Sequence, residues 1–106
     1  MALLDAKIES PEELFIYKLG AALTMEETIL ELLEKLQQEA NDPSLRRQLQ
    51  QHHKETQGQV DNLHRVFEAL GEPIDRRPCP AIEGLEKEGD MLLKEVDDSL
   101  NDAVIL

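Results

Sequence analysis

Apolar residues recur at alternating steps of four and three along two long stretches of the sequence. This spacing predicts two helices that each bury one side. The first stripe comprises Phe15, Leu19, Ala22, Glu26, Ile29, Leu33, Leu36 and Ala40. The second comprises Leu45, Leu49, His52, Thr56, Gln59, Leu63, Val66 and Leu70. Both stripes become polar near their middle, and those polar positions need an explanation.

Local signals predict where the two helices begin. Ser10 can cap the first helix, Pro11 suits its first position, and Glu13 is expected to reach back to the Ser10 amide as a capping box. Asp42-Pro43 is the same kind of start for the second helix. The first helix is therefore expected over about residues 11–40.

The second helix is expected to end near Leu70, because Gly71 is the residue type found just past helix ends. Its predicted span is about 43–70. So short a connection makes the two helices an antiparallel hairpin. With the turn centred near Asn41 and Asp42, Glu26 is expected to face about position 57 or 58 of the second helix.

The remainder of the chain predicts a loop and shorter helices. Residues 71–79 contain prolines without periodicity, which is typical of a connector. A third helix is expected over about 80–96, and a further one from about 103, capped by Asp102. The inward positions of the third helix would be Ile82, Leu85, Gly89, Leu92 and Val96. The fold class is therefore all-α, with residues 1–106 as a single domain.

Composition limits the classes of function. The formal net charge is −12, which argues against nucleic-acid or anionic-membrane partners and favours cations. One cysteine, Cys79, excludes an internal disulfide, fits a reducing compartment and is expected to be an inert thiol. The sequence shows neither a signal peptide nor a transmembrane run, so we expect a soluble, cytoplasmic protein.

The polar positions of the two stripes predict a metal site. Glu55 lies three residues after His52 and four before Gln59, on the same side of the helix. Carboxylates that face one another in a core need a cation or shared protons. Glu26, Glu55 and His52 are therefore candidate ligands, with Gln59 as an extra donor. Such a set suits iron or manganese better than structural zinc.

One hairpin offers half of the ligands of a dinuclear bundle site. Such bundles take a Glu from each of two helices and a Glu/His pair from each of the other two. Two copies of the chain would supply the full set and complete a four-helix bundle by dimerisation. The alternative is a helical interaction module whose polar layer only specifies pairing, without metal. His53 and His64 fall off the stripe and are expected to be solvated.

Three segments resemble the YciE/YciF type of ferritin-like family, from about residue 10 to the C-terminus. They are His52-x-x-Glu55-Thr56-x-Gly58-Gln59-Val60, Val66-Phe67-Glu68-x-Leu70-Gly71 and Cys79-x-Ala81-x-Glu83-Gly84-Leu85-x-x-Glu88-Gly89. The resemblance implies a di-iron carboxylate bundle linked to bacterial stress responses. Glu26 and Glu55 would carry over as metal ligands, together with His52 and Gln59. The expected activity is binding of Fe(II) and its oxidation by dioxygen or peroxide.

The sequence departs from this family in two ways. Ferritins usually have Glu-x-x-His on the second helix, whereas this chain has His52-x-x-Glu55. Family members also continue through a second long hairpin, while this sequence stops at Leu106. The expectation is therefore either a fragment or a chain in which a second copy replaces the missing half.

Overall fold

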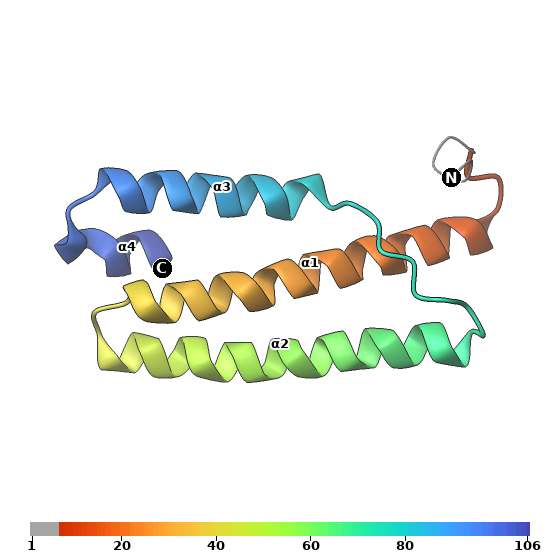
Figure 1. The fold of residues 1–106 in the computed structure, drawn as a ribbon, viewed down its shortest axis with the longest axis horizontal. Coiled ribbons are helices and arrows are strands. Elements are labelled where there is room, and N and C mark those ends of the chain that lie inside the picture. Colours follow the sequence, from red (N-terminus) through yellow and green to blue (C-terminus); the bar gives the residue numbers. More distant parts are fainter. Residues whose placement is uncertain (1–6) are drawn as a thin grey trace.

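The computed structural model describes residues 7–106, and within them the protein is all-α as expected. The helices are α1 (Pro11–Glu39), α2 (Pro43–Ala69), α3 (Pro80–Glu95) and α4 (Asn101–Ile105). A short 3-10 turn, Asp98–Leu100, precedes α4. The first three helices lie side by side with α1 in the middle, and α4 folds back toward the α1–α2 turn (Figure 1).

Both long helices begin at the caps that the sequence indicates. The Ser10 hydroxyl accepts a hydrogen bond from the Glu13 amide at 3.1 Å, and Pro11 follows as the first helical residue. The Glu13 carboxylate accepts from the Glu9 amide at 2.9 Å, so its expected bond to the Ser10 amide is replaced by one a residue earlier. Either bond satisfies an amide that the helix leaves free.

The α2 helix ends in a left-handed turn. Gly71 has φ of 68°, which is costly for residues that carry a Cβ. The Gly71 amide donates to the Glu68 carbonyl and the Glu72 amide donates to the Phe67 carbonyl, each at 3.0 Å. These bonds satisfy carbonyls that the helix end would leave unpaired. The glycine therefore lets the chain leave α2 toward the loop.

Two clusters of buried side chains join α1 to α2. Near the turn, the cluster is Leu33, Ala40, Leu45 and Leu49. Toward the other end, the cluster is Leu23, Val60 and Phe67. Leu23 of α1 and Val60 of α2 lie opposite each other in the hairpin, as its short connection predicts. The hairpin is thus held along its length by two apolar contacts with polar positions between them.

The buried side of α2 differs from the predicted stripe. Its buried residues are Leu45, Leu49, Thr56, Val60 and Phe67. The expected inward residues His52, Gln59 and Leu70 are exposed instead. Buried residues recur at intervals of 11, as in Leu45, Thr56 and Phe67. On an ideal helix a heptad stripe drifts by about 20° per repeat, whereas an 11-residue repeat drifts more slowly along the helix and in the opposite sense. A stripe predicted with heptad spacing therefore leaves the buried side of α2, which explains the error.

The predicted stripe on α1 is also displaced over its first half. Leu33 and Ala40 are buried as expected, but Leu23 is fully buried in place of its neighbour Ala22. Phe15, expected to be inward, is 51% exposed. On both helices the buried residue is the one directly after the predicted residue, Leu23 after Ala22 and Val60 after Gln59. The predicted polar side chains are therefore turned away from the contact between the helices.

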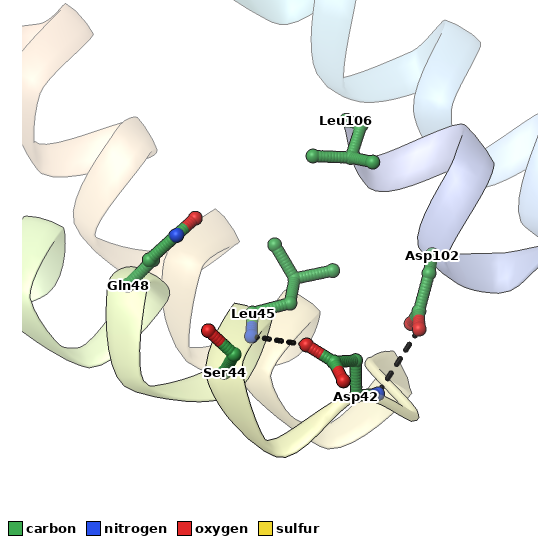
Figure 2. A pocket seen from close by; sticks show the side chains of 6 residues that line it. All are labelled: Asp42, Ser44, Leu45, Gln48, Asp102 and Leu106. Carbon is green, nitrogen blue, oxygen red and sulfur yellow. Dashed lines mark hydrogen bonds between the residues drawn. The ribbon is translucent and has the colours of Figure 1, made fainter.

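The C-terminal segment is fastened to the α1–α2 turn. The Asp102 carboxylate accepts from the Asn41 amide at 2.7 Å and from the Asp42 amide at 3.0 Å. Figure 2 shows this carboxylate beside Asp42, which itself caps α2 by accepting from the Leu45 amide. The predicted role of Asp102 as the cap of its own helix was therefore wrong, because α4 begins earlier, at Asn101.

Candidate metal site on the open side of the hairpin

The hairpin has two flanks that differ in what covers them. We call the flank with Gly20, Glu27 and His64 the covered side, because the loop of residues 71–79 crosses α1 there (Figure 1). The opposite flank is the open side, defined by Ala22, Glu26, Gln59, Asn62, Leu63 and Val66, which line one hollow.

Gly20 allows the loop to lie directly on α1. It is buried, and a Cβ at this position would stand 2.0 Å from the Asp75 carbonyl oxygen. No side chain larger than hydrogen fits without moving the loop backbone. A glycine between Leu19 and Ala21 inside an apolar helical stretch is the only local sign of this contact.

Charged side chains fix the same loop to α1. The Arg76 guanidinium donates two hydrogen bonds to the Glu27 carboxylate, at 2.7 and 2.9 Å. These hydrogen bonds, with a smaller contribution from the charge on Arg76, lower the pKa of Glu27 below its usual value. The Arg77 guanidinium lies 5.2 Å from the centre of the Tyr17 ring and bonds to Asp75. The loop is therefore an ordered part of the covered side.

The two histidines expected to be solvated are half-buried, so that expectation was wrong. His53 Nε2 lies 3.1 Å from Glu34 Oε1 across the hairpin. His64 Nε2 is buried without a hydrogen-bond partner among the described residues. The partial burial of both histidines has the same cause as the burial of Val60 and the exposure of Gln59. The side of α2 that packs on α1 is rotated relative to the predicted stripe.

The open side brings together two of the four predicted metal ligands. Glu26 of α1 is half-buried, and Gln59 of α2 lines the same hollow of ≈ 280 Å³. The other lining residues are Ala22, Asn62, Leu63 and Val66. Glu26 thus lines a hollow whose walls are mainly apolar.

The other two predicted ligands, His52 and Glu55, lie nearer the start of α2 and are exposed. The Glu55 carboxylate accepts from the Gln51 side-chain amide at 3.1 Å. The Thr56 hydroxyl lies 3.4 Å from His52 Nδ1, although it donates a shorter hydrogen bond, at 2.8 Å, to the His52 carbonyl. That second bond satisfies the fully buried hydroxyl of Thr56. Both His52 and Glu55 therefore bond within their own helix.

The structure consequently does not assemble the four residues into one cluster. Among residues 7–106, no group of three or more His, Cys, Asp or Glu side chains is close enough to hold a metal ion. The donors still share a flank, because His52, Glu55 and Gln59 follow one another at helical spacing toward the level of Glu26. Their chemistry fits a cation that prefers oxygen and imidazole, but the set within one chain is partial.

An all-α protein organised around a long antiparallel hairpin is the class that these features define. Residues 10–106 match the DUF892 family, a domain of unknown function, and the chain belongs to this family. A similar solved structure is "YcfI, a putative structural protein from Rhodopseudomonas palustris", with a TM-score of 0.88 and 35% sequence identity. The match covers 93% of this chain and 64% of that one. The search of curated proteins gave no match.

Over residues 7–106, each helix is too short or too polar to cross a lipid bilayer.

Proposed function

We propose that the open side is one half of a dinuclear metal site, most suited to iron, in a ferritin-like bundle. The observation that supports this proposal is that the half-buried Glu26 lines a mainly apolar hollow together with Gln59. A partly desolvated carboxylate attracts a positive partner more strongly than a carboxylate in bulk water does. Here the partner would be a metal ion, with manganese as the alternative to iron.

The ligands from this chain would be Glu26 and Glu55, with His52 as the nitrogen donor and Gln59 as an additional oxygen donor. Bound iron would supply redox chemistry between its ferrous and ferric states, with Fe(II) as the substrate and dioxygen or peroxide as the oxidant. The chain's own part is to hold these donors on two helices whose register is fixed by the buried Leu23 and Val60.

Further donors would be needed to complete the site, because the described residues form only a partial set. We propose that they come from a second copy, so that the working unit is a homodimer. The setting would be the cytoplasm, since a single cysteine suits a reducing compartment. Protection against oxidative stress is the role that this chemistry would serve.

Titration with Fe(II) tests the proposal. Under anaerobic conditions we expect saturable binding by calorimetry, and on admission of oxygen we expect oxidation faster than in buffer. Glu26→Ala and Glu55→Ala should each weaken binding by at least about tenfold. Glu31→Ala is the matched control, because Glu31 is an exposed carboxylate of α1 that does not line the hollow. A wild-type protein that binds neither iron nor manganese would exclude the proposal.

A second candidate is an assembly module that works without metal. The observation that favours it is the exposed apolar surface on the same flank, where Phe15 is 51% and Leu70 46% exposed. Replacing Glu26, His52 and Glu55 together by Leu should then keep or raise stability and leave self-association intact. The metal hypothesis predicts that this variant loses iron binding and any dependence of assembly on iron.

A further inference from the structure

The side of α1 that faces away from α2 carries an apolar hollow of ≈ 470 Å³. Its lining includes Leu14, Tyr17, Lys18, Ala21, Met25 and Cys79. Leu14, Lys18, Ala21 and Met25 follow one another at steps of four and three, so they share one side of the helix. At about 100° per residue, Ala21 and Met25 stand roughly opposite Leu23, which packs on α2. None of the four proposed metal ligands lines this hollow.

The hollow arises because α3 is shorter than α1. The two helices have 16 and 29 residues, so α3 leaves about 20 Å of α1 without a covering helix. α3 lies along the second half of α1, where the Lys35 ammonium bonds to the Asp90 carboxylate at 2.7 Å (Figure 1). Cys79 directly precedes α3 and lines the hollow, which therefore lies where α3 begins.

The charge in the wall of this hollow is positive. Lys18 lines it, and within residues 7–106 no Asp or Glu does. Three other hollows have only carboxylates as charged lining groups: Asp42 and Asp102 in one, Glu12 and Glu72 in another, and Glu26 in the third. The whole chain has a net charge of −12, so a positive wall is the exception on this protein. Of these four hollows, the one at Lys18 favours an anion.

The aromatic wall has a second cation behind it. The Arg77 guanidinium lies 5.2 Å from the centre of the Tyr17 ring. The Asp75 carboxylate bonds to Arg77 at 3.0 Å and offsets part of its charge, so Lys18 remains the main attraction for an anion. The Tyr17 hydroxyl is a possible additional hydrogen-bond donor.

The remainder of the wall is apolar and partly in contact with solvent. Ile8 is 44% and Leu14 42% exposed, while Ala21 and Met25 are half-buried. An apolar chain laid against these side chains would remove their surface from water, which is favourable. The flexible Met25 side chain can adapt to the shape of a ligand. The volume lies within the range of about 300–1,000 Å³ that small-molecule sites have.

We propose that this hollow binds a free fatty acid of medium chain length. Its carboxylate pairs with the Lys18 ammonium, and its chain lies against Leu14, Ala21 and Met25. A fatty acid matches the wall in both respects, because it combines one negative charge with one apolar chain. A neutral amphiphile lacks the pairing with Lys18, and a small anion without a chain leaves the apolar wall in water.

Calorimetry on metal-free protein at pH 7 tests the proposal with decanoate as the probe. We expect saturable binding at one site, about fivefold tighter than that of decanol, because the ion pair involves a partly solvated lysine. From octanoate to dodecanoate, each added CH₂ group should tighten binding by up to about fourfold until the hollow is filled. Absence of saturable decanoate binding, or equal affinity for decanol, would overturn the proposal.

Substitutions at Lys18 separate the specific charge from the net charge. Lys18→Gln should weaken decanoate binding by about fivefold and leave decanol binding unchanged. Lys18→Glu should weaken decanoate binding by at least about tenfold, because it places a like charge at the carboxylate. Lys87→Glu is the control, since Lys87 is an exposed lysine of α3 outside the hollow and its replacement changes the net charge equally. Equal weakening by this control would count against the site.

The thiol of Cys79 reports occupancy of the hollow, because Cys79 lines it and the chain has one cysteine. Saturating decanoate should slow alkylation of this thiol by iodoacetamide at least about threefold, whereas acetate, which lacks the chain, should not. Ala21→Leu fills the hollow and should remove both binding and protection. An alkylation rate that bound decanoate leaves unchanged would place the ligand elsewhere. These measurements use no metal, so their outcome is separate from that of the iron titration.

Discussion

Glu26 and Glu27 are neighbours on α1, yet they belong to opposite flanks of the hairpin. Glu27 is on the covered side, where the Arg76 guanidinium holds its carboxylate with two hydrogen bonds. Glu26 is on the open side, in a hollow with apolar walls and Gln59. One carboxylate is thus hydrogen-bonded within the chain, whereas the other belongs to a residue that lies beside apolar side chains.

The comparison separates residues that stabilise the fold from residues that are available for function. On the covered side, Gly20 of α1 contacts the loop and Arg77 of the loop packs on the Tyr17 ring, so changes there should alter stability. On the open side, Phe15 and Glu26 each line a hollow, so changes there should alter association or metal binding with little effect on the folded monomer. Paired substitutions of the same residue type can test this division.

The largest effect is expected from two phenylalanines. Phe67 is 1% exposed in the cluster with Leu23 and Val60, whereas Phe15 is 51% exposed on the open side. Phe67→Ala should lower the free energy of unfolding by about 3–5 kcal/mol, because it leaves a cavity. Phe15→Ala should lower that of the monomer by less than about 1 kcal/mol. Urea denaturation at low protein concentration measures both, and comparable losses would contradict the division.

Two glycines give a smaller contrast, of opposite sign. Gly20→Ala would place a Cβ against the loop backbone, and we expect a loss of about 1–3 kcal/mol in the free energy of unfolding. Gly58→Ala meets no atom within 4 Å in the middle of α2, so it should stabilise by up to about 1 kcal/mol through helix propensity. Urea midpoints give the sign directly. Stabilisation by Gly20→Ala would show that the loop is free to move away.

The helix ends could be predicted because their signals are local. Ser10 and Asp42 cap the helices they precede, and Gly71 follows α2 with a positive φ. Each of these signals depends on residues within one helical turn. Fold class and hairpin topology follow from the same information, since two long helices with a short connection have few other arrangements.

The register of the buried stripe could not be resolved in the same way. Leu45, Leu49 and Thr56 fit both a heptad and an 11-residue repeat, and the two patterns separate only at Gln59 and Val60. The contacts of the covered side could not be predicted from local sequence patterns either. Glu27 and Arg76 are 49 residues apart in the sequence, and charged residues at that separation have many alternative partners.

The smallest expected effect concerns the Glu27–Arg76 pair and its dependence on pH. The pKa of Glu27 is lowered in the folded protein, so the folded state prefers the ionised carboxylate more than the unfolded state does. Its contribution is therefore fully present above the usual value of 4.5 and is lost as pH falls through the lower folded value. Because the Arg76 side chain is 52% exposed, solvent screening limits the contribution to about 1 kcal/mol at most.

Glu27→Gln measures this contribution against Glu31→Gln, which removes the same charge at an exposed position of α1. At pH 7 the first variant should be less stable than the second, and the difference should shrink below about pH 4.5 as Glu27 of the wild type is protonated. High salt should reduce the difference as well. Urea titrations at several pH values measure this difference in stability between the two variants. A difference that persists unchanged at pH 3 would assign the loop's attachment to Gly20 and Arg77 rather than to this ion pair.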